Sequence, residues 1–391
     1  SRVSRGLGDV YKRQIGGLVA AGIGRQLGTP NDGSQISIPA TMVYLDADDE
    51  QPLICEDKVT WYDARYHNET RAPEWRLYYK SNDVSNRFQP GDFFMIALTT
   101  EGNLLMIFCS PESDYELQIR SLFGVRDTET NERGLTRVIM DMAVAAPIRL
   151  MFARYGIEVG NDGTNYLDRI LDRFGPTFPK TREFSSFARS LTEDICPASH
   201  PDQALFNWME AEESAFRQLE KHIVQEKLRA GFGENGDDVD EFVRFSLSVQ
   251  NRRKCRSGHA FENHIEEILI ASGLNFERGA KTEGRQKPDF LFPNSASYAN
   301  LDFPVEQLRI LGAKTTCKDR WRQVLAEAER IEHKHLITME PAISEHQTNQ
   351  MRDKNLQLVV PEDLHQHYLP GQAEWLMTFR EFIDEVKGLT R

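Results

Sequence analysis

The stretch that decides the fold is Pro288-Asp289-Phe290-Leu291-Phe292 together with Leu308-Arg309-Ile310-Leu311-Gly312-Ala313-Lys314. Both segments are short apolar runs, a pattern that is typical of buried strands. An Asp stands near the start of the first run and a Lys closes the second, so pairing of the two strands would bring these charged side chains together. The sequence therefore predicts neighbouring strands that carry a carboxylate and an ammonium group at a shared end.

The segments around these two runs alternate between helical and strand-like spacing. We expect helices at residues 202–230, 237–249, 259–272 and 318–331, and strands at residues 288–292, 307–315, 335–339 and 356–360. A helix, two strands, a second helix and two further strands form the order of an α/β sandwich. The second half of the chain is therefore predicted to be an α/β domain.

The first half of the chain has a different pattern, with short period-2 apolar runs separated by Asn, Asp, Gly and Pro. This pattern predicts a β-rich domain, and the Gly-containing turn at residues 100–103 predicts a hairpin. Residues 145–179 are rich in turn-forming residues, as linkers are. Residues 1–14 lack an initiator Met and an apolar signal core, so we expect them to be a non-native adapter. The predicted organisation is a first domain at 15–150, a linker at 151–175 and a second domain at 176–391.

Composition restricts the class of protein. A chain of 391 residues exceeds the usual size of one domain. The formal net charge of −13 argues against a general polyanion binder, although residues 251–337 carry 15 Lys and Arg against 12 Asp and Glu. The 5 cysteines are scattered without CxxC pairs, as expected for reduced thiols in a cytoplasmic protein. We also expect no membrane span, because no apolar run approaches the required length of about 18 residues.

Asp289 and Lys314 are candidates for the hydrolysis of a phosphodiester, because that reaction uses carboxylates to hold Mg²⁺ and a cation near the developing charge. A standard nuclease pattern has an acidic residue two positions before the Lys, but here that position is Gly312. The second carboxylate must then come from elsewhere, and the helix at 259–272 offers Glu262 and Glu266. The alternatives are a simple turn at Pro288-Asp289 and two solvated glutamates one turn apart.

The helix expected at 318–331 has a polar face that offers candidate DNA contacts. Arg320 and Glu327 are of the residue types that read G·C pairs in a major groove, whereas Lys318 and Arg322 would contact phosphates. The alternative is that this face is only solvated.

Three blocks of sequence, at residues 251–258, 282–293 and 314–323, resemble the EcoRII family of restriction endonucleases. The resemblance continues at 335–338 and 358–361 and covers roughly the second half of the chain. It implies a PD-(D/E)xK nuclease fold whose second carboxylate lies on the preceding helix. Under this resemblance Glu262, Asp289 and Lys314 form the catalytic set, Tyr298 matches a further active-site position, and Asp289 and Glu262 bind Mg²⁺.

The first domain resembles the effector domain of the same family more weakly, through short matches at residues 31–33, 38–39, 68–71, 75–76 and 107–110. The resemblance implies a B3-like DNA-binding pseudobarrel in which Arg71, Trp75 and Arg76 bind an allosteric copy of DNA, as in type IIE enzymes. The alternative is an exposed loop with ordinary arginines.

Together these features lead us to expect a homodimeric type II restriction endonuclease that cuts both strands of double-stranded DNA at a short pseudopalindromic, G·C-flanked site. A cognate DNA methyltransferase would belong to the same system without direct contact. Two alternatives remain open, because a fold alone does not fix a function. One is a catalytically degenerate DNA-binding homologue, and the other is a repair or mismatch nuclease on the same fold.

Overall fold

The structure is a computed structural model that describes residues 2–5, 13–122, 135–137 and 165–389, apart from short gaps at 20–21, 30–31, 47–51, 69, 100–101, 193–194, 234–235, 237, 284–285 and 318–319. The chain divides into two compact units, Ser1–Val144 and Ala145–Arg391. Most of the linker expected at 151–175 lies outside the described residues, and its last part is helix α5 (Leu167–Phe174) of the second unit.

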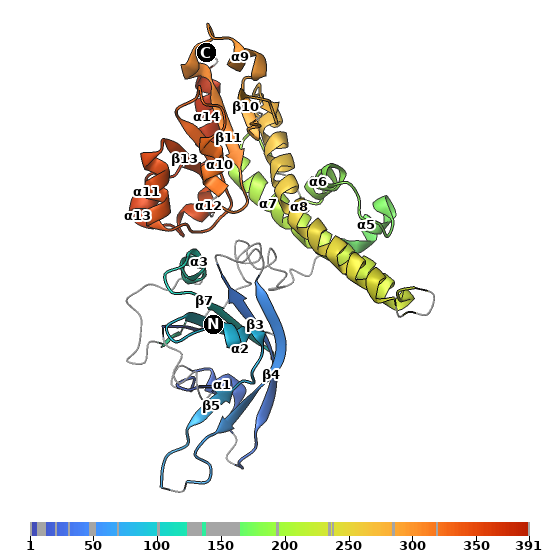
Figure 1. The fold of residues 1–391 in the computed structure, drawn as a ribbon, viewed down its shortest axis with the longest axis vertical. Helices are drawn as coiled ribbons and strands as arrows, with labels where there is room; N and C mark the ends of the chain where they lie inside the picture. Colours follow the sequence, from blue (N-terminus) through green and yellow to red (C-terminus); the bar gives the residue numbers. More distant parts are fainter. Residues whose placement is uncertain are drawn as a thin grey trace. The chain divides into compact units, whose positions relative to one another are not determined.

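The first unit is built on one sheet that curls into a half-barrel, as the β-rich pattern predicted (Figure 1). Its strand order is β2-β5-β4-β3-β7-β6-β1-β8, and β3 and β7 form a parallel pair within an otherwise antiparallel sheet. The strands are β1 (Arg2–Arg5), β2 (Gln14–Ile15), β3 (Ile36–Leu45), β4 (Leu53–Asp63), β5 (Trp75–Tyr78), β6 (Phe93–Leu98), β7 (Leu104–Cys109) and β8 (Leu135–Arg137), and the helices are α1 (Gly24–Leu27), α2 (Asp83–Arg87) and α3 (Asp114–Leu122).

Strands β1, β2, β4 and β8 of this sheet were not expected from the sequence. Strand β4 carries charged side chains at alternate positions and has an exposed face, so its apolar signal is weak. Strand β1 lies within the segment excluded as an adapter, yet it pairs with β6 and β8. The excluded segment therefore contributes a strand to the sheet, and its non-native origin stays a prediction.

The hairpin between β6 and β7 is confirmed. The two strands pair antiparallel up to Leu98 and Leu104. The turn is closed by the amide of Thr99, which donates to the carbonyl of Asn103 at 2.8 Å, and Gly102 adopts a φ of +81°. A left-handed conformation at this position explains why the turn contains a glycine.

The second unit begins with helices, of which α7 and α8 are long and lie side by side (Figure 1). Their bounds are α6 (Thr181–Arg189), α7 (Pro201–Ala230) and α8 (Val239–Ala271). The sequence predicted two helices where α8 runs through 33 residues without a break. The polar segment between the two predicted helices contains no proline, so no residue there interrupts the backbone hydrogen bonds of the helix.

Five strands follow in the order β13-β12-β11-β10-β9. Strands β9, β10 and β11 pair antiparallel, while β11, β12 and β13 are parallel. The strands are β9 (Glu277–Arg278), β10 (Phe290–Phe292), β11 (Arg309–Ala313), β12 (Lys334–Ile337) and β13 (Leu356–Val359), and the helices are α9 (Ser295–Ala299), α10 (Trp321–Leu325), α11 (Glu345–Asp353), α12 (Glu362–His365), α13 (Pro370–Ala373) and α14 (Phe379–Leu389). The expected α/β architecture is thereby confirmed.

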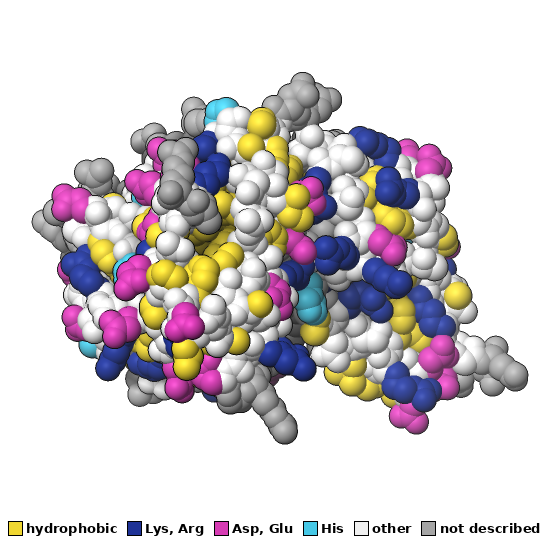
Figure 2. All heavy atoms as spheres, turned by 90° about the horizontal axis from the view of Figure 1, so that it is seen from above, with side chains coloured by type: hydrophobic (Ala, Val, Ile, Leu, Met, Phe, Trp, Pro, Cys, Tyr) yellow, Lys and Arg dark blue, Asp and Glu magenta, His cyan; other side chains and the backbone are white. Residues whose placement is uncertain are grey.

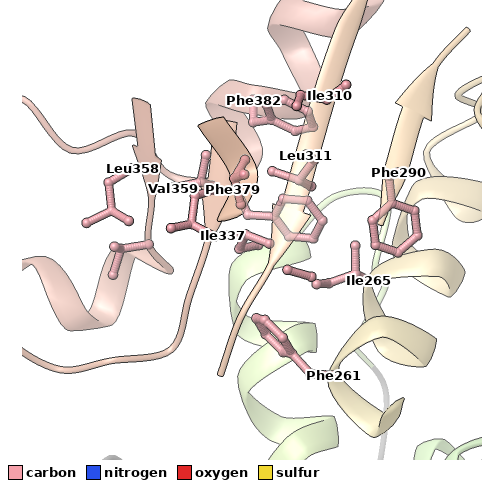
Figure 3. Close-up of a cluster of buried hydrophobic side chains, with 14 of the residues drawn as sticks. Phe261, Ile265, Phe290, Ile310, Leu311, Ile337, Leu358, Val359, Phe379 and Phe382 are labelled. Carbon is pink, nitrogen blue, oxygen red and sulfur yellow. The ribbon is translucent and has the colours of Figure 1, made fainter. Parts of the chain in front are cut away.

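The core of the second unit joins this sheet to the flanking helices. Figure 3 shows Phe261 and Ile265 of α8 facing the strand residues Phe290, Leu311 and Ile337, all buried. Each such side chain contributes roughly 1.5–3 kcal/mol by leaving water. The core therefore fixes the ends of β10 and β11 relative to α8, which is where the predicted catalytic residues lie.

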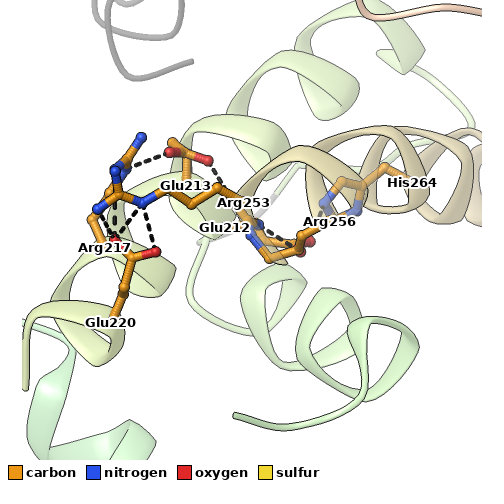
Figure 4. Close-up of polar contacts among 7 residues, drawn as sticks. All are labelled: Glu212, Glu213, Arg217, Glu220, Arg253, Arg256 and His264. Atoms are coloured by element: carbon orange, nitrogen blue, oxygen red, sulfur yellow. Dashed lines mark hydrogen bonds and ion pairs between the residues drawn. The ribbon is translucent and has the colours of Figure 1, made fainter. Parts of the chain in front are cut away.

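A buried ionic network joins α7 to α8 (Figure 4). Arg256 pairs with Glu212 at 3.0 Å and with Glu213, and His264 Nε2 lies 2.9 Å from a Glu212 oxygen. Burial lowers the pKa of His264. Burial alone would raise the pKa of Glu212, but the His264 and Arg256 contacts hold it below its usual value. The carboxylate is therefore ionised and paired inside the helix interface.

Candidate active site

Asp289 and Lys314 meet as the sequence predicted. Asp289 immediately precedes β10 and Lys314 immediately follows β11, and the two strands pair with Phe290 opposite Leu311. Lys314 Nζ donates to Asp289 Oδ2 at 2.7 Å, and the amide of Ala313 donates to the same oxygen at 2.7 Å. Both side chains are about one-sixth exposed, at 16% and 17%. The pair is thus fixed yet open to a ligand.

The position two residues before Lys314 is closed to a carboxylate for a steric reason. A Cβ on Gly312 would lie 2.6 Å from Cγ2 of Val324, which belongs to α10. Helix α10 packs against the strand so closely that only glycine fits there. The second acidic group of the site must therefore come from another element.

Glu262, the residue expected to supply that group, is tied to an arginine. Arg278 on β9 donates to Glu262 Oε2 and to Glu266 Oε2, each at 2.7 Å. Burial alone would lower the pKa of Arg278, but the two glutamates raise it above its usual value. Glu262 is therefore on the expected side of α8, where its charge is neutralised by Arg278. Its role as a metal ligand stays a prediction.

Glu327 occupies a different environment from the one expected. The predicted helix at 318–331 is shorter, since α10 ends at Leu325, and Glu327 is 8% exposed. Burial, together with the nearby charge of Asp289, raises the pKa of Glu327 to about 7, while Lys314 and Lys334 oppose the change. The prediction that Glu327 lies on an exposed polar face is wrong, and its role in base reading stays a prediction. The structure instead brings its carboxylate into the electrostatic field of Asp289 and Lys314.

A sequence signal for Glu327 existed. It stands three residues after Val324 and four before Ile331, so helical spacing already assigned it to the edge of the apolar face. Its Oε2 atom is buried and has no hydrogen-bond partner among the residues that the structure describes. Buried carboxylate oxygens are normally satisfied.

The donor set fits a hard divalent cation held partly by water. Within the described part of the chain no group of three or more His, Cys, Asp or Glu side chains is arranged to hold a metal ion. Mg²⁺, however, usually takes only one or two protein carboxylates and keeps several waters. Asp289 and Glu327 are two carboxylates whose charges influence each other, and the Glu327 oxygen without a partner among the described residues is of the type that a cation would bind.

Tyr298, the further active-site candidate, lies on α9 and is buried. Its hydroxyl donates to Glu283 at 2.6 Å and accepts from the amide of Arg330 at 3.2 Å. Burial raises the pKa of Tyr298 to about 12, and the Glu283 carboxylate adds to this effect. The hydroxyl therefore stays protonated. Its described contacts are with the turn that follows α10 rather than with Asp289.

The other candidate DNA contacts near α10 are the basic residues Lys318, Arg320 and Arg322. Lys318 lies outside the described residues. Arg320 and Arg322 are exposed, and Arg322 donates to Gln350 at 3.2 Å. Figure 2 shows basic and acidic side chains side by side on the face that it draws. In the part of the chain that the structure describes, no helix is long and apolar enough to cross a membrane.

The candidate effector residues of the first unit differ from one another. Arg71 is exposed in the loop between β4 and β5. Trp75 is 7% exposed and stacks on Trp61 with ring centroids 5.5 Å apart, so its expected availability to DNA is wrong. Arg76 is half-buried and donates to Glu74 at 2.9 Å and to Gln14 at 2.6 Å.

Comparison with known proteins places this geometry in a family. The type II restriction enzyme EcoRII of Escherichia coli is 33% identical over 338 residues, which are 85% of this chain and 80% of that enzyme. The chain belongs to the EcoRII family of type II restriction enzymes. The model of the EcoRII C-terminal domain matches residues 216–383 of this EcoRII-family member and therefore includes Asp289, Lys314 and Glu327. The type II restriction enzyme SsoII of Shigella sonnei is 24% identical over 156 residues, 37% of this chain and 50% of that enzyme.

Two solved structures are also similar to this EcoRII-family chain. Metal-depleted Ecl18kI in complex with uncleaved, modified DNA gives a TM-score of 0.46 at 19% identity, covering 57% of this chain and 83% of that one. The complex of restriction endonuclease PspGI with substrate DNA gives a TM-score of 0.45 at 16% identity, covering 55% of this chain and 95% of that one.

Proposed function

We propose that this EcoRII-family enzyme hydrolyses both strands of double-stranded DNA at a short pseudopalindromic, G·C-flanked sequence with Mg²⁺ as cofactor. The observation that carries the proposal is the Asp289–Lys314 pair with Glu327 beside it. Carboxylates and a lysine converging at strand ends match what phosphodiester hydrolysis needs.

Asp289 and Glu327 would hold the cation, which when bound supplies a Lewis acid for the scissile phosphate. Lys314 is placed to donate a hydrogen bond to the attacking water or to a phosphate oxygen, and thereby to offset negative charge in the transition state. Lys314 Nζ donates to Asp289 Oδ2, and this contact keeps the ammonium group beside the carboxylate. Glu262 remains the alternative second ligand, and Arg278 would have to release it.

The finer assignment of the fold is part of the proposal. We assign the second unit to the PD-(D/E)xK nucleases, because β10 and β11 bring Asp289 and Lys314 together, and the first unit to the B3-like pseudobarrels, because its sheet curls into a half-barrel. The domain bounds follow as residues 15–150 and 176–391 with a linker between them.

We further propose that the first unit binds a second, activating copy of DNA. The support is Arg71, an exposed cation in the β4–β5 loop, while Trp75 and Arg76 hold the strand that presents it. Arg320 and Arg322 of the second unit are exposed cations suited to target DNA. A cognate DNA methyltransferase is expected in the same system.

A homodimer is the proposed functional form. A two-fold protein suits a pseudopalindromic site and delivers one active site to each strand. Exposed apolar side chains at helical spacing on α8 are consistent with a surface that a second copy covers. They are Val239, Phe242, Val243 and Leu247.

Digestion of a large, sequenced, unmethylated DNA tests the proposal, with wild type and Asp289→Ala each assayed in Mg²⁺ and in EDTA. We expect discrete fragments from the wild type in Mg²⁺ and intact DNA in the other three reactions. Intact DNA in all four reactions would indicate a homologue that only binds DNA. Random nicking would indicate a repair-type nuclease.

A further inference from the structure

The chain makes an unusual turn directly after Glu327. Ala328 is fully buried and adopts a left-handed φ of +50°, which is strained for a residue with a Cβ. The turn ends helical geometry and leads to Arg330, and the amide of Ile331 donates to the carbonyl of Ala328 at 2.9 Å. Such a conformation persists only where surrounding groups hold it.

Lys334, the first residue of β12, holds the turn from within the core. Its side chain is 6% exposed, and Nζ donates to the carbonyl of Glu327 and, at 3.1 Å, to that of Ala328. Two consecutive carbonyl groups are thus satisfied by one buried ammonium group. The position of Lys334 is itself fixed, because its backbone belongs to the parallel pairing of β12 with β13.

Glu283 and Tyr298 hold the other half of the same turn. The amide of Glu329 donates to Glu283, and the amide of Arg330 donates to the hydroxyl of Tyr298. The hydroxyl in turn donates to Glu283 at 2.6 Å. Side chains from three separate parts of the chain therefore bind the backbone of four consecutive residues, from Glu327 to Arg330.

The contacts to this turn bear on the orientation of the Glu327 carboxylate. Its Oε2 atom has no hydrogen-bond partner among the described residues, so no bond to this oxygen orients the side chain. The direction of the carboxylate is then set mainly by the backbone that carries it. We propose that Lys334, Tyr298 and Glu283 form a clamp that positions the Glu327 carboxylate for a divalent cation shared with Asp289.

The inference rests on the proposed function, and it makes Tyr298 a positioning residue rather than a catalytic one. Tyr298→Phe removes the hydroxyl and keeps the ring, and Lys334→Met removes both carbonyl contacts while keeping the chain length. Residues that orient metal ligands typically contribute about 10- to 100-fold to metal affinity. We therefore expect each variant to bind Mn²⁺ about 10-fold more weakly, as measured by electron paramagnetic resonance of the free ion.

Glu385→Gln is the matched control, because it breaks a half-buried ion pair with Arg309 at the opposite end of β11. It should bind Mn²⁺ like the wild type. In a Glu327→Gln background, Tyr298→Phe and Lys334→Met should cause no further loss, since the clamp acts through Glu327. Thermal melting of each variant excludes a general loss of structure.

The outcomes separate the two proposals. If Glu327→Gln weakens Mn²⁺ binding but the folded clamp variants bind like the wild type, the clamp proposal is wrong and the metal site stands. If the wild type does not bind Mn²⁺, or Glu327→Gln binds it equally well, the metal site itself is wrong and the clamp falls with it. Further loss from the clamp variants in the Glu327→Gln background would also overturn the clamp.

Discussion

A Cβ atom on Gly312 would lie 2.6 Å from Cγ2 of Val324, so β11 and α10 are in contact at the position where a nuclease of the standard pattern carries an acidic side chain. The absence of the usual carboxylate is thus a consequence of packing. Under the proposed function, Glu327 from the turn after α10 takes the place of that carboxylate.

Gly312→Ala should therefore destabilise the protein. Forcing a methyl group into a filled core costs about 1–3 kcal/mol, and the loss is measurable as a lower midpoint of urea unfolding. In a Val324→Ala background the two clashing methyl groups are gone, so the added cost of Gly312→Ala should shrink. An equal cost in both backgrounds would contradict the packing explanation.

The two candidate second carboxylates can be separated by isosteric substitution. Glu327→Gln should raise the Mg²⁺ concentration needed for half-maximal DNA cleavage by about 10-fold or more, because its Oε2 has no partner among the described residues and its pKa responds to the charge of Asp289. Glu262→Gln should have a smaller effect, because Arg278 already engages that carboxylate. The reverse order would restore Glu262 as the metal ligand. Asp289→Asn serves as the reference for loss of a ligand.

The sequence predicted the part of the site that depends on neighbouring strands. Asp289 and Lys314 flank two apolar runs, and strand pairing alone brings them together. Glu327 was assigned to the wrong face because its environment depends on where α10 ends. That end is set by the left-handed Ala328 and the groups that bind this turn, which lie up to 46 residues away in the chain. Local periodicity placed Glu327 at the edge of the apolar face, but it contains no information on where α10 ends.

Helix α8 and Trp75 are two further cases in which local sequence patterns did not predict the structure. The apolar periodicity of α8 is interrupted by a polar stretch, yet the backbone continues because Arg256 finds buried partners on α7. Trp75 looked available for binding, but its partner Trp61 lies on β4, a strand that the sequence pattern did not reveal. Contacts between distant segments decided both cases.

The raised pKa of Glu327 predicts a pH dependence of stability in the metal-free protein. Its usual pKa is 4.5 and burial raises it to about 7, so the folded state binds the proton more tightly than the unfolded state. The resulting stabilisation is full below pH 4.5 and is lost as pH rises to about 7. A shift from 4.5 to about 7 corresponds to a loss of roughly 3 kcal/mol. The unfolding free energy in EDTA, measured for wild type minus Glu327→Gln, should fall across this window. If this difference in unfolding free energy did not change with pH, the raised pKa of Glu327 would be refuted.

The network between α7 and α8 predicts a large cost for removing Arg256. Arg256→Met leaves Glu212 and Glu213 buried with fewer partners, and breaking such a pair typically costs about 3–5 kcal/mol. The control is Arg229→Met, which removes an exposed ion pair with Glu226 at the C-terminal end of α7. It should cost no more than about 0.5 kcal/mol. Equal effects in urea unfolding would show that burial is not what makes the network matter.

The contrast between Trp75 and Arg71 predicts separate effects on folding and on DNA binding in the first unit. Trp75→Ala removes a buried ring stacked on Trp61 and should cost about 3–5 kcal/mol, seen as a lower melting temperature.

Arg71→Ala removes an exposed cation and should leave the melting temperature unchanged. If Arg71 contacts a phosphate of the activating copy, Arg71→Ala should also weaken binding of a short DNA duplex to the full chain and reduce the salt dependence of that binding by about one ion. An unchanged affinity and salt dependence in Arg71→Ala would remove Arg71 from the proposed DNA contact and leave the β4–β5 loop as an ordinary surface loop.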